Sequence, residues 1–149
     1  MHVELQNIAL IGLGTTVDLE KLAANSPAAE HITMNISSNL RFPEPDRVEC
    51  LVTMVSRSEI EAIRFQCTYQ GVFSLSVDPE LFESEQSKIS AICTAKMFPY
   101  IKELVADVTR RLPMTAPIML SPALGNESAL LNQMNLQSTG VAQQEETKQ

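Results

Sequence analysis

The stretch VECLVTMVSRSEIEAIRFQCTY, residues 48–69, decides the fold. Apolar residues recur at every second position in each half of it, and the two halves are separated by a polar run around Ser58-Glu59. A repeat of two is the side-chain period of a β-strand. The stretch therefore predicts two strands of one hairpin, each with an apolar face. The two apolar sets are Val48, Cys50, Val52 and Met54, and then Ile63, Phe65, Cys67 and Tyr69.

The register of this hairpin depends on its loop. With a two-residue turn at Ser58-Glu59, Cys50 lies opposite Cys67, and all the apolar pairs share one face. A slip by one residue would separate the two apolar sets, so we expect this register. A longer irregular loop also fits, because Ser-Glu lacks the glycine or asparagine that two-residue turns favour. The expected pairs are Met54 with Ile63, Val52 with Phe65, Cys50 with Cys67, and Val48 with Tyr69.

Two more strands are expected before the hairpin. The first alternates with one slip at Asn7, which marks either a bulge or a poor strand, and Gly12 and Gly14 then loosen the chain. The second ends at Pro43 and Pro45, because proline removes a donor from the sheet ladder. Their apolar positions are Val3, Leu5, Ile8 and Leu10 in the first, and Ile32, Met34 and Ile36 in the second.

Residues 78–112 change to helical spacing. Asp78 is the expected N-cap, and Pro79 is the expected first helical residue. Apolar residues follow at steps of three and four, so we expect one face of the helix to pack against the sheet. Because its ring does not fit an unbroken helix interior, Pro99 is expected to interrupt this helix and to open a second one. Arg110-Arg111 suit the negative C-terminal end of a helix.

The last part of the chain changes character twice. Residues 113–125 hold three prolines among apolar residues, which predicts an apolar loop where loops are normally polar. Asn126 then caps a short helix that carries Leu130, Leu131 and Met134. After Leu136 the residues are too polar to bury anything. We expect one domain over residues 1–136 and a disordered polar tail over 137–149.

Composition excludes several classes of protein. The 149 residues, 44% of them hydrophobic, match a single domain. Eighteen acidic against 11 basic residues give a net charge of −7, which disfavours nucleic acids and anionic membranes as partners. No apolar run approaches the ~20 residues that span a bilayer, and residues 1–20 do not resemble a signal peptide. We expect a soluble, cytoplasmic protein with no membrane insertion.

The residues that usually carry catalysis are few and scattered. Cys50, Cys67 and Cys93 form no Cys-x-x-Cys pair, and His2 and His31 have no second ligand at metal-binding spacing. The cysteines are expected to be reduced packing residues and the histidines to be surface residues. No nucleophile with a base, no paired acids and no glycine-rich cofactor loop is visible. We therefore expect no enzyme activity, no catalytic residues, no metal and no cofactor.

The run MFPYIKE at 97–103 resembles Leu-Phe-Pro-Tyr-Ala-Arg-Glu of the SecB family of bacterial export chaperones, and further motifs of that family follow in the same order. GVFSL at 71–75 is similar to Gly-Ile-Phe-Ser/Thr-Ile, and AIC at 91–93 matches Ala-Tyr-Cys. IMLSP at 118–122 resembles Leu-x-Leu-Ala-Pro, and the residues from Asn126 to Leu131 resemble Asn-Phe-Asp-Ala-Leu-Phe. The likeness covers residues 30–136.

The resemblance implies a fold and a function. The fold is α+β, with a SecB-like four-stranded antiparallel sheet, a long helix packed on one face and a short C-terminal helix. Members of the family are ATP-independent holdases that bind unfolded precursor polypeptides in apolar grooves and pass them to the motor SecA. They pair into dimers, and two dimers pack into a homotetramer. Residues 1–136 would then form a SecB-like chaperone domain.

The apolar loop supports such a groove. An acidic, soluble chain must bury this loop in an oligomer or offer it to a partner, since large exposed apolar patches mark binding sites. Methionine suits a promiscuous groove because its flexible side chain repacks around different guests. Alternatively, the strand residues pack beneath their own helix. The candidate client-binding residues are Ile32, Met34, Ile36, Met119, Leu120, Leu124, Leu130, Leu131 and Met134.

The sequence departs from the family where SecA docks. The resemblance places family acidic positions of the exposed sheet face on Gly12, Thr16 and Gln66, and an apolar position on Arg64. We therefore expect weak or altered SecA docking. Two alternatives stay open. One is a SecB-like chaperone dedicated to a client such as an antitoxin, and the other is a carrier of a small apolar ligand with the apolar loop as a lid.

Overall fold

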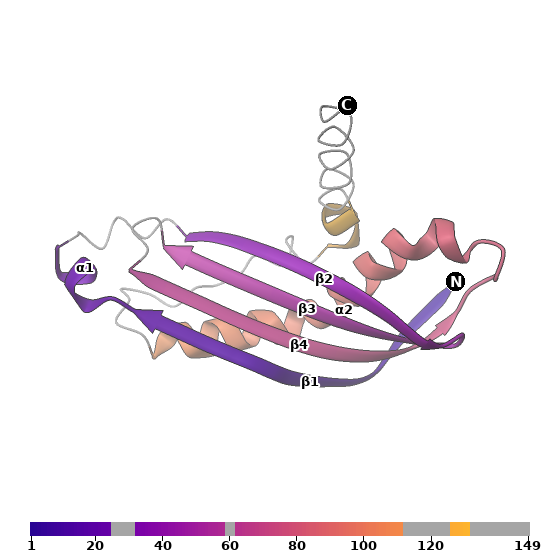
Figure 1. Ribbon diagram of the computed structural model, residues 1–149, viewed down its shortest axis with the longest axis horizontal. Coiled ribbons are helices and arrows are strands. Elements are labelled where there is room, and N and C mark those ends of the chain that lie inside the picture. The colour runs from indigo at the N-terminus through magenta and orange to yellow at the C-terminus, as the bar shows by residue number, and fades with distance from the viewer. Residues whose placement is uncertain (25–31, 59–61, 112–125, 132–149) are drawn as a thin grey trace, which may run out of the picture.

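The computed structural model describes residues 1–24, 32–58, 62–111 and 126–131 (Figure 1). Its strands are β1 (His2–Val17), β2 (Ile32–Glu44), β3 (Arg47–Ser58) and β4 (Ile63–Ser76). Its helices are α1 (Leu19–Ala24) and α2 (Phe82–Arg110), and a short helical segment covers residues 127–131. In Figure 1 the long helix α2 crosses behind the sheet. The expected α+β fold, with one long helix on one face of an antiparallel sheet, is confirmed.

The four strands form one antiparallel sheet in the order β1-β4-β3-β2. β1 and β2 are therefore the two edge strands, and β3 and β4 lie in the middle. The pairing of β1 with β4 shifts between Leu5 and Asn7, so the slip in the sequence is a β-bulge. A second shift lies between Leu10 and Gly12. β1 continues through Gly12 and Gly14 to Val17, so these glycines do not end the strand.

The expected register of the central hairpin was wrong, although its faces were right. Cys50 pairs with Gly71 rather than with Cys67, which is a shift of four residues, and Met54 pairs with Cys67. A shift by an even number keeps every side chain on its face, so the alternation excluded only odd slips. The two strands are joined through residues 59–62, in agreement with the longer-loop alternative.

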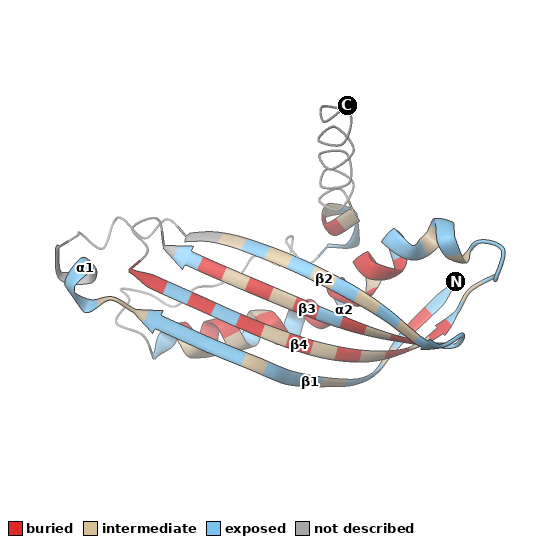
Figure 2. Ribbon diagram, in the orientation of Figure 1, coloured by how far each residue is buried: buried red, intermediate tan, exposed pale blue. Residues whose placement is uncertain are grey.

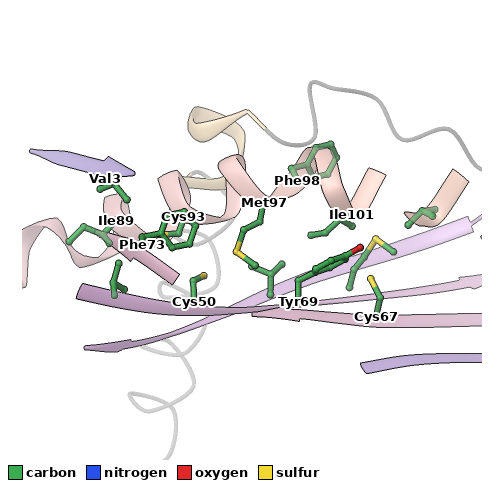
Figure 3. Packing of buried hydrophobic residues seen from close by; sticks show 14 of the residues in the cluster. Val3, Cys50, Cys67, Tyr69, Phe73, Ile89, Cys93, Met97, Phe98 and Ile101 are labelled. Carbon is green, nitrogen blue, oxygen red and sulfur yellow. The ribbon is translucent and has the colours of Figure 1, made fainter. Parts of the chain in front are cut away.

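The inner face of the sheet and one face of α2 make the core. Buried residues appear on alternate positions of β3 and β4 in Figure 2, and those of β4 follow a strict alternation from Ile63 to Leu75. Figure 3 shows α2 residues such as Met97 and Ile101 pointing toward the side chains that rise from the sheet. The three cysteines are buried and free, as expected for packing residues. The core cluster comprises Val3, Val48, Cys50, Val52, Met54, Phe65, Cys67, Tyr69, Phe73, Leu75, Ile89, Cys93, Met97, Phe98, Ile101 and Val105.

The start of α2 differs from the expectation. The helix begins at Phe82 with Leu81 as its N-cap, so Asp78 is not the cap and Pro79 is not the first helical residue. Asp78 instead closes a turn before the helix. Its carboxylate accepts a hydrogen bond from the N–H of Glu80 at 3.1 Å, and its carbonyl accepts one from Leu81 at 3.0 Å.

Pro99 does not interrupt α2, which continues from Phe82 to Arg110 as one helix of 29 residues. The expected second start was therefore wrong. Pro99 itself is exposed, while Met97, Phe98 and Ile101 around it are buried. Burying an apolar side chain stabilises the fold by roughly 1.5–3 kcal/mol, and a proline in a helix interior costs about 3 kcal/mol. Packing on both sides of the proline outweighs that cost.

The ends of two elements agree with their sequence signals. β2 ends at Glu44, next to Pro43, after a shift in its pairing with β3. The side chain of Asn126 accepts a hydrogen bond from the N–H of Ser128 at 2.8 Å and so caps the short helical segment. The apolar loop at 113–125 and the polar tail at 137–149 lie outside the described residues.

Candidate functional site: apolar strips beside the long helix

The helix α2 covers the inner face of the sheet unevenly. On the central strands its cover is complete, because Val52, Met54 and Cys67 are all 0% exposed. On the two edge strands, apolar side chains of the same face remain partly or largely in contact with solvent (Figure 2). Two strips of apolar surface thus flank the helix, one on β2 and one on β1.

The first of these, the β2 strip, consists of Met34, Ile36, Leu40 and Phe42. All four are half-buried and pack against the core cluster. Two contacts fasten this edge to α2. The hydroxyl groups of Ser38 and Ser90 lie 2.7 Å apart, and the ring centroids of Phe42 and Phe82 lie 4.8 Å apart in an edge-to-face arrangement. These contacts therefore hold the β2 strip against α2, and part of its apolar surface remains exposed to solvent.

The second, the β1 strip, consists of Leu10, Ile11 and Leu13, which are 41%, 55% and 52% exposed. Leu10 pairs with Tyr69 and Leu13 pairs with Cys67, so both belong to the inner face. Their partners on β4 are buried, whereas they are not. Ile11 lies at the shift between Leu10 and Gly12. The strip follows an edge strand, whose outer backbone groups have no neighbouring strand among the described residues.

The candidate client-binding residues fall into three groups. Met34 and Ile36 lie in the β2 strip, and Ile32 begins the same strand. In the short helical segment Leu131 is half-buried, but Leu130 is only 2% exposed, so its side chain is closed off in this conformation. Met119, Leu120, Leu124 and Met134 lie outside the described residues.

The β1 strip was not among the candidates. The sequence did place Leu10 on the apolar face of the first strand, but alternation does not say how far a helix reaches across a sheet. The glycines after Leu10 also suggested that the strand ended there. An apolar run LIGL at 10–13 on an edge strand was the available signal.

The buried polar groups are those of a packed core rather than of a reactive centre. The Cys50 thiol is hydrogen-bonded to that of Cys93, and this contact, followed by burial, raises the pKa of Cys93. Burial raises the pKa of Cys67 to about 11. A thiol is nucleophilic only as thiolate, so these pKa values disfavour reactivity. Burial also raises the pKa of Tyr69, whose hydroxyl donates a hydrogen bond of 3.5 Å to the carbonyl of Tyr100.

The described part of the chain shows no metal-ligating cluster, and the hollows on its surface are open. Residues 1–24, 32–58, 62–111 and 126–131 contain no group of three metal-ligating side chains, and none of their helices is long and apolar enough to cross a membrane. Two open surface hollows of about 480 and 440 Å³ are lined largely by polar and charged side chains. Glu44, Asp46 and Arg47 line the first, and Lys102 and Asp107 line the second.

Comparison with known proteins agrees with this fold. No family model matches the sequence. The protein-export protein SecB of Azorhizobium caulinodans is 27% identical to the chain over 118 residues, which are 74% of this chain and 72% of that protein. A solved structure of the SecB-like chaperone Rv1957 of Mycobacterium tuberculosis, in complex with a ChAD peptide from the Rv1956 HigA1 antitoxin, matches with a TM-score of 0.57. That match is 15% identical in sequence and covers 80% of this chain and 88% of the other.

Together the fold and the relative define the class, an α+β protein with the SecB-like arrangement of sheet and helix. The sequence match and the shared fold support a divergent member of the SecB-like family.

Proposed function

We propose that the protein is an ATP-independent holdase that binds unfolded polypeptides on the apolar strips beside α2. The observation that carries the proposal is the β2 strip, an apolar surface that the helix α2 covers only in part. Half-open apolar surface on a chain with a net charge of −7 suits a partner that is itself apolar and extended. The clients are precursor proteins kept competent for export, and the protein acts in the cytoplasm.

The client contacts are assigned to the β2 strip together with the apolar loop. Met34 and Ile36 contribute through their exposed parts, and methionine adapts to different guests. Leu130 is assigned to packing, since its side chain is enclosed. The other contacts of this proposal are Ile32, Met119, Leu120, Leu124, Leu131 and Met134.

The β1 strip is assigned to subunit contact. Leucine and isoleucine side chains more than 40% exposed on an edge strand are a liability for a monomer, and a second copy of the chain would cover them. We propose a homo-oligomer, a dimer of dimers, in which β1 contributes to the contact within each dimer. Light scattering gives its mass, and a monomer at micromolar concentration would contradict this assignment.

The test of the holdase proposal is a client-aggregation assay without ATP. Met34→Glu and Leu120→Glu should each delay the aggregation of a denatured client less than the natural protein does, with unchanged far-UV circular dichroism. Asn35→Glu is the matched control for Met34→Glu, because it adds the same charge at an exposed neighbouring position on the opposite face. Equal protection by the Met34 and Asn35 variants would remove the β2 strip from the client site.

A chaperone dedicated to one client is a second candidate. The neighbour Rv1957 was solved with an antitoxin peptide bound, which favours a role of this kind for a divergent chain. The two candidates differ in breadth. A general holdase delays the aggregation of unrelated clients, whereas a dedicated one protects a single partner and leaves the others unprotected.

A further inference from the structure

The outer face of the sheet, away from α2, has a charge distribution unlike that of the whole chain. The protein carries 18 acidic and 11 basic residues. On the outer positions of the central strands, however, Arg47, Arg57 and Arg64 stand against the single carboxylate of Glu49. A chain that is acidic overall thus carries a net positive charge on the outer positions of its central strands, with the arginines at the two ends.

The arginines at the two ends of this face differ in whether a carboxylate neutralises their charge. At one end Arg47 forms an ion pair of 3.4 Å with Glu49, and Arg41 is the cross-strand neighbour of that same carboxylate. At the other end Arg57 of β3 pairs directly with Arg64 of β4. Both side chains are exposed, and no described residue forms an ion pair with either.

Two like charges directly opposite each other on a sheet repel, because the Cβ atoms of such a pair lie only about 4.5–5.5 Å apart. A carboxylate placed between them would be attracted by both, and each guanidinium can form two parallel hydrogen bonds to it. Thr16 is the neighbour of Arg64 on β1 and is exposed, which adds a hydroxyl group beside the pair. These three side chains can hold an acidic group.

The surroundings fit a polypeptide better than a phosphate polymer. Beyond the arginine pair the central strands carry no charge on this face up to Glu49. Gln66 and Leu51 are exposed there, and the hydroxyl groups of Thr53 and Thr68 lie within 3.1 Å of each other. Gly14, at which an added Cβ would meet nothing within 4 Å, leaves open space beside Gln66. Nucleic acids usually need several more cationic contacts, and the net charge of −7 repels them.

We propose that the outer face of the sheet docks an acidic segment of a partner protein, with Arg57 and Arg64 holding its carboxylates. This surface lies opposite the apolar strips, so a partner docked here leaves the client side of the sheet free. The proposal does not depend on holdase activity.

The experiment measures binding of a fluorescent peptide by the full chain at low and at moderate salt. The probe is a Gly/Ser peptide with four glutamates, and its counterpart carries glutamine instead. The glutamate peptide should bind more tightly, and its affinity should fall as salt rises. Arg57→Gln/Arg64→Gln should weaken it about fivefold, the loss expected for two exposed charge contacts.

The control is Arg110→Gln/Arg111→Gln, a pair of exposed arginines at the end of α2. Both double variants take the net charge from −7 to −9, because each removes two positive charges. The control should retain the affinity of the natural chain. An equal loss in both variants would trace the binding to overall charge and overturn the proposal, as would equal binding of the glutamine peptide or no binding at all.

Two further arms test whether the chain's own carboxylates or a phosphate group occupy the arginines instead. Glu59 and Glu61 lie between the two arginines in the sequence, so binding seen only in Glu59→Gln/Glu61→Gln would mean that these carboxylates occupy the arginines, and the proposal would fail. Tighter binding of inorganic tripolyphosphate than of the glutamate peptide would assign the site to phosphate and also overturn it. Aggregation assays on Arg57→Gln/Arg64→Gln should match the natural protein, which keeps this result separate from the holdase test.

Discussion

Gly71 lies where the sheet and the long helix α2 approach each other closely. A Cβ atom added there would come within 2.7 Å of the Met97 sulfur and 2.7 Å of a ring carbon of Phe73. Real Cβ contacts are longer, so the sulfur and the ring would both have to move. Gly71 also pairs with Cys50, whose side chain points into the same layer.

We expect Gly71→Ala to lower the free energy of unfolding by about 1–3 kcal/mol, the usual cost of overpacking a core. Gly14→Ala is the control, because its added Cβ meets nothing within 4 Å. Alanine generally suits a strand better than glycine, so the control should be neutral or slightly stabilising. Urea denaturation of both variants gives the comparison. Equal effects would mean that the contact with Met97 relaxes without cost.

Cys67 makes stability depend on pH. Burial raises the pKa of its thiol to about 11, against 9.0 for a thiol in water. Between these values the unfolded chain has lost the proton and the folded chain has kept it. The unfolded state therefore binds fewer protons, and the free energy of unfolding falls as pH rises from about 9 to about 11.

Denaturation of the natural protein and of Cys67→Ala across this pH range measures the effect. The difference in unfolding free energy between the two should shrink as pH rises, because only the natural chain has this thiol to ionise. A constant difference would show that the pKa of the Cys67 thiol is the same in the folded and the unfolded chain.

At the scale of the elements, α2 shows that tertiary packing can override a local sequence preference. The proline at position 99 argued for two helices, and the chain forms one, since the side chains around it are buried. We expect Pro99→Ala to raise the free energy of unfolding by about 1–3 kcal/mol, because alanine restores the missing N–H donor and removes the ring from the helix interior.

Lys96→Ala is the matched control, as Lys96 is exposed on the same helix and already has its N–H. Its effect should stay within about 0.5 kcal/mol. Loss of stability in Pro99→Ala would mean that the ring gives α2 the shape it needs to fit the sheet.

The elements also show what alternation in a sequence can and cannot decide. It gave the faces of β3 and β4, and its slip at Asn7 pointed to a bulge or a poor strand in β1, because both depend on whether a residue is odd or even along a strand. It did not give the register, since Cys50 keeps its face whether it lies opposite Cys67 or Gly71. The choice between these registers depends on the loop and on packing against α2, which no strand pattern contains.

For the candidate site, too, the sequence predicted which residues share a face but not which of them stay exposed. Met34 and Ile36 were predicted as client-binding residues because they share a face, and both lie in the partly exposed β2 strip beside α2. Leu10 and Leu13 share the corresponding face on β1, but their exposure depends on where α2 stops covering the sheet. Whether α2 covers a residue of β1 depends on the tertiary structure, so it could not be predicted from the spacing of apolar residues in the sequence.

At the scale of the whole molecule, the outer face of the sheet bears on partner choice. The four positions that suggested weak SecA docking, Gly12, Thr16, Arg64 and Gln66, lie on two neighbouring strands. Their pairing places all four on the outer face, where Thr16 is the neighbour of Arg64 and Gly14 that of Gln66. At these four positions the outer face is neutral or basic.

We therefore expect SecA to bind weakly or not at all. A basic docking surface would meet Arg57 and Arg64 where it needs carboxylates, and unlike charges across an interface chiefly set the encounter rate and the specificity. Calorimetry at low salt measures the affinity, with a typical SecB as the reference. Arg64→Glu/Gln66→Glu restores acidic character to this end of the face and should tighten binding, whereas Arg110→Glu/Arg111→Glu, at the end of α2, should not. SecA binding by the natural chain as tight as that of the reference would mean that docking does not use this face here.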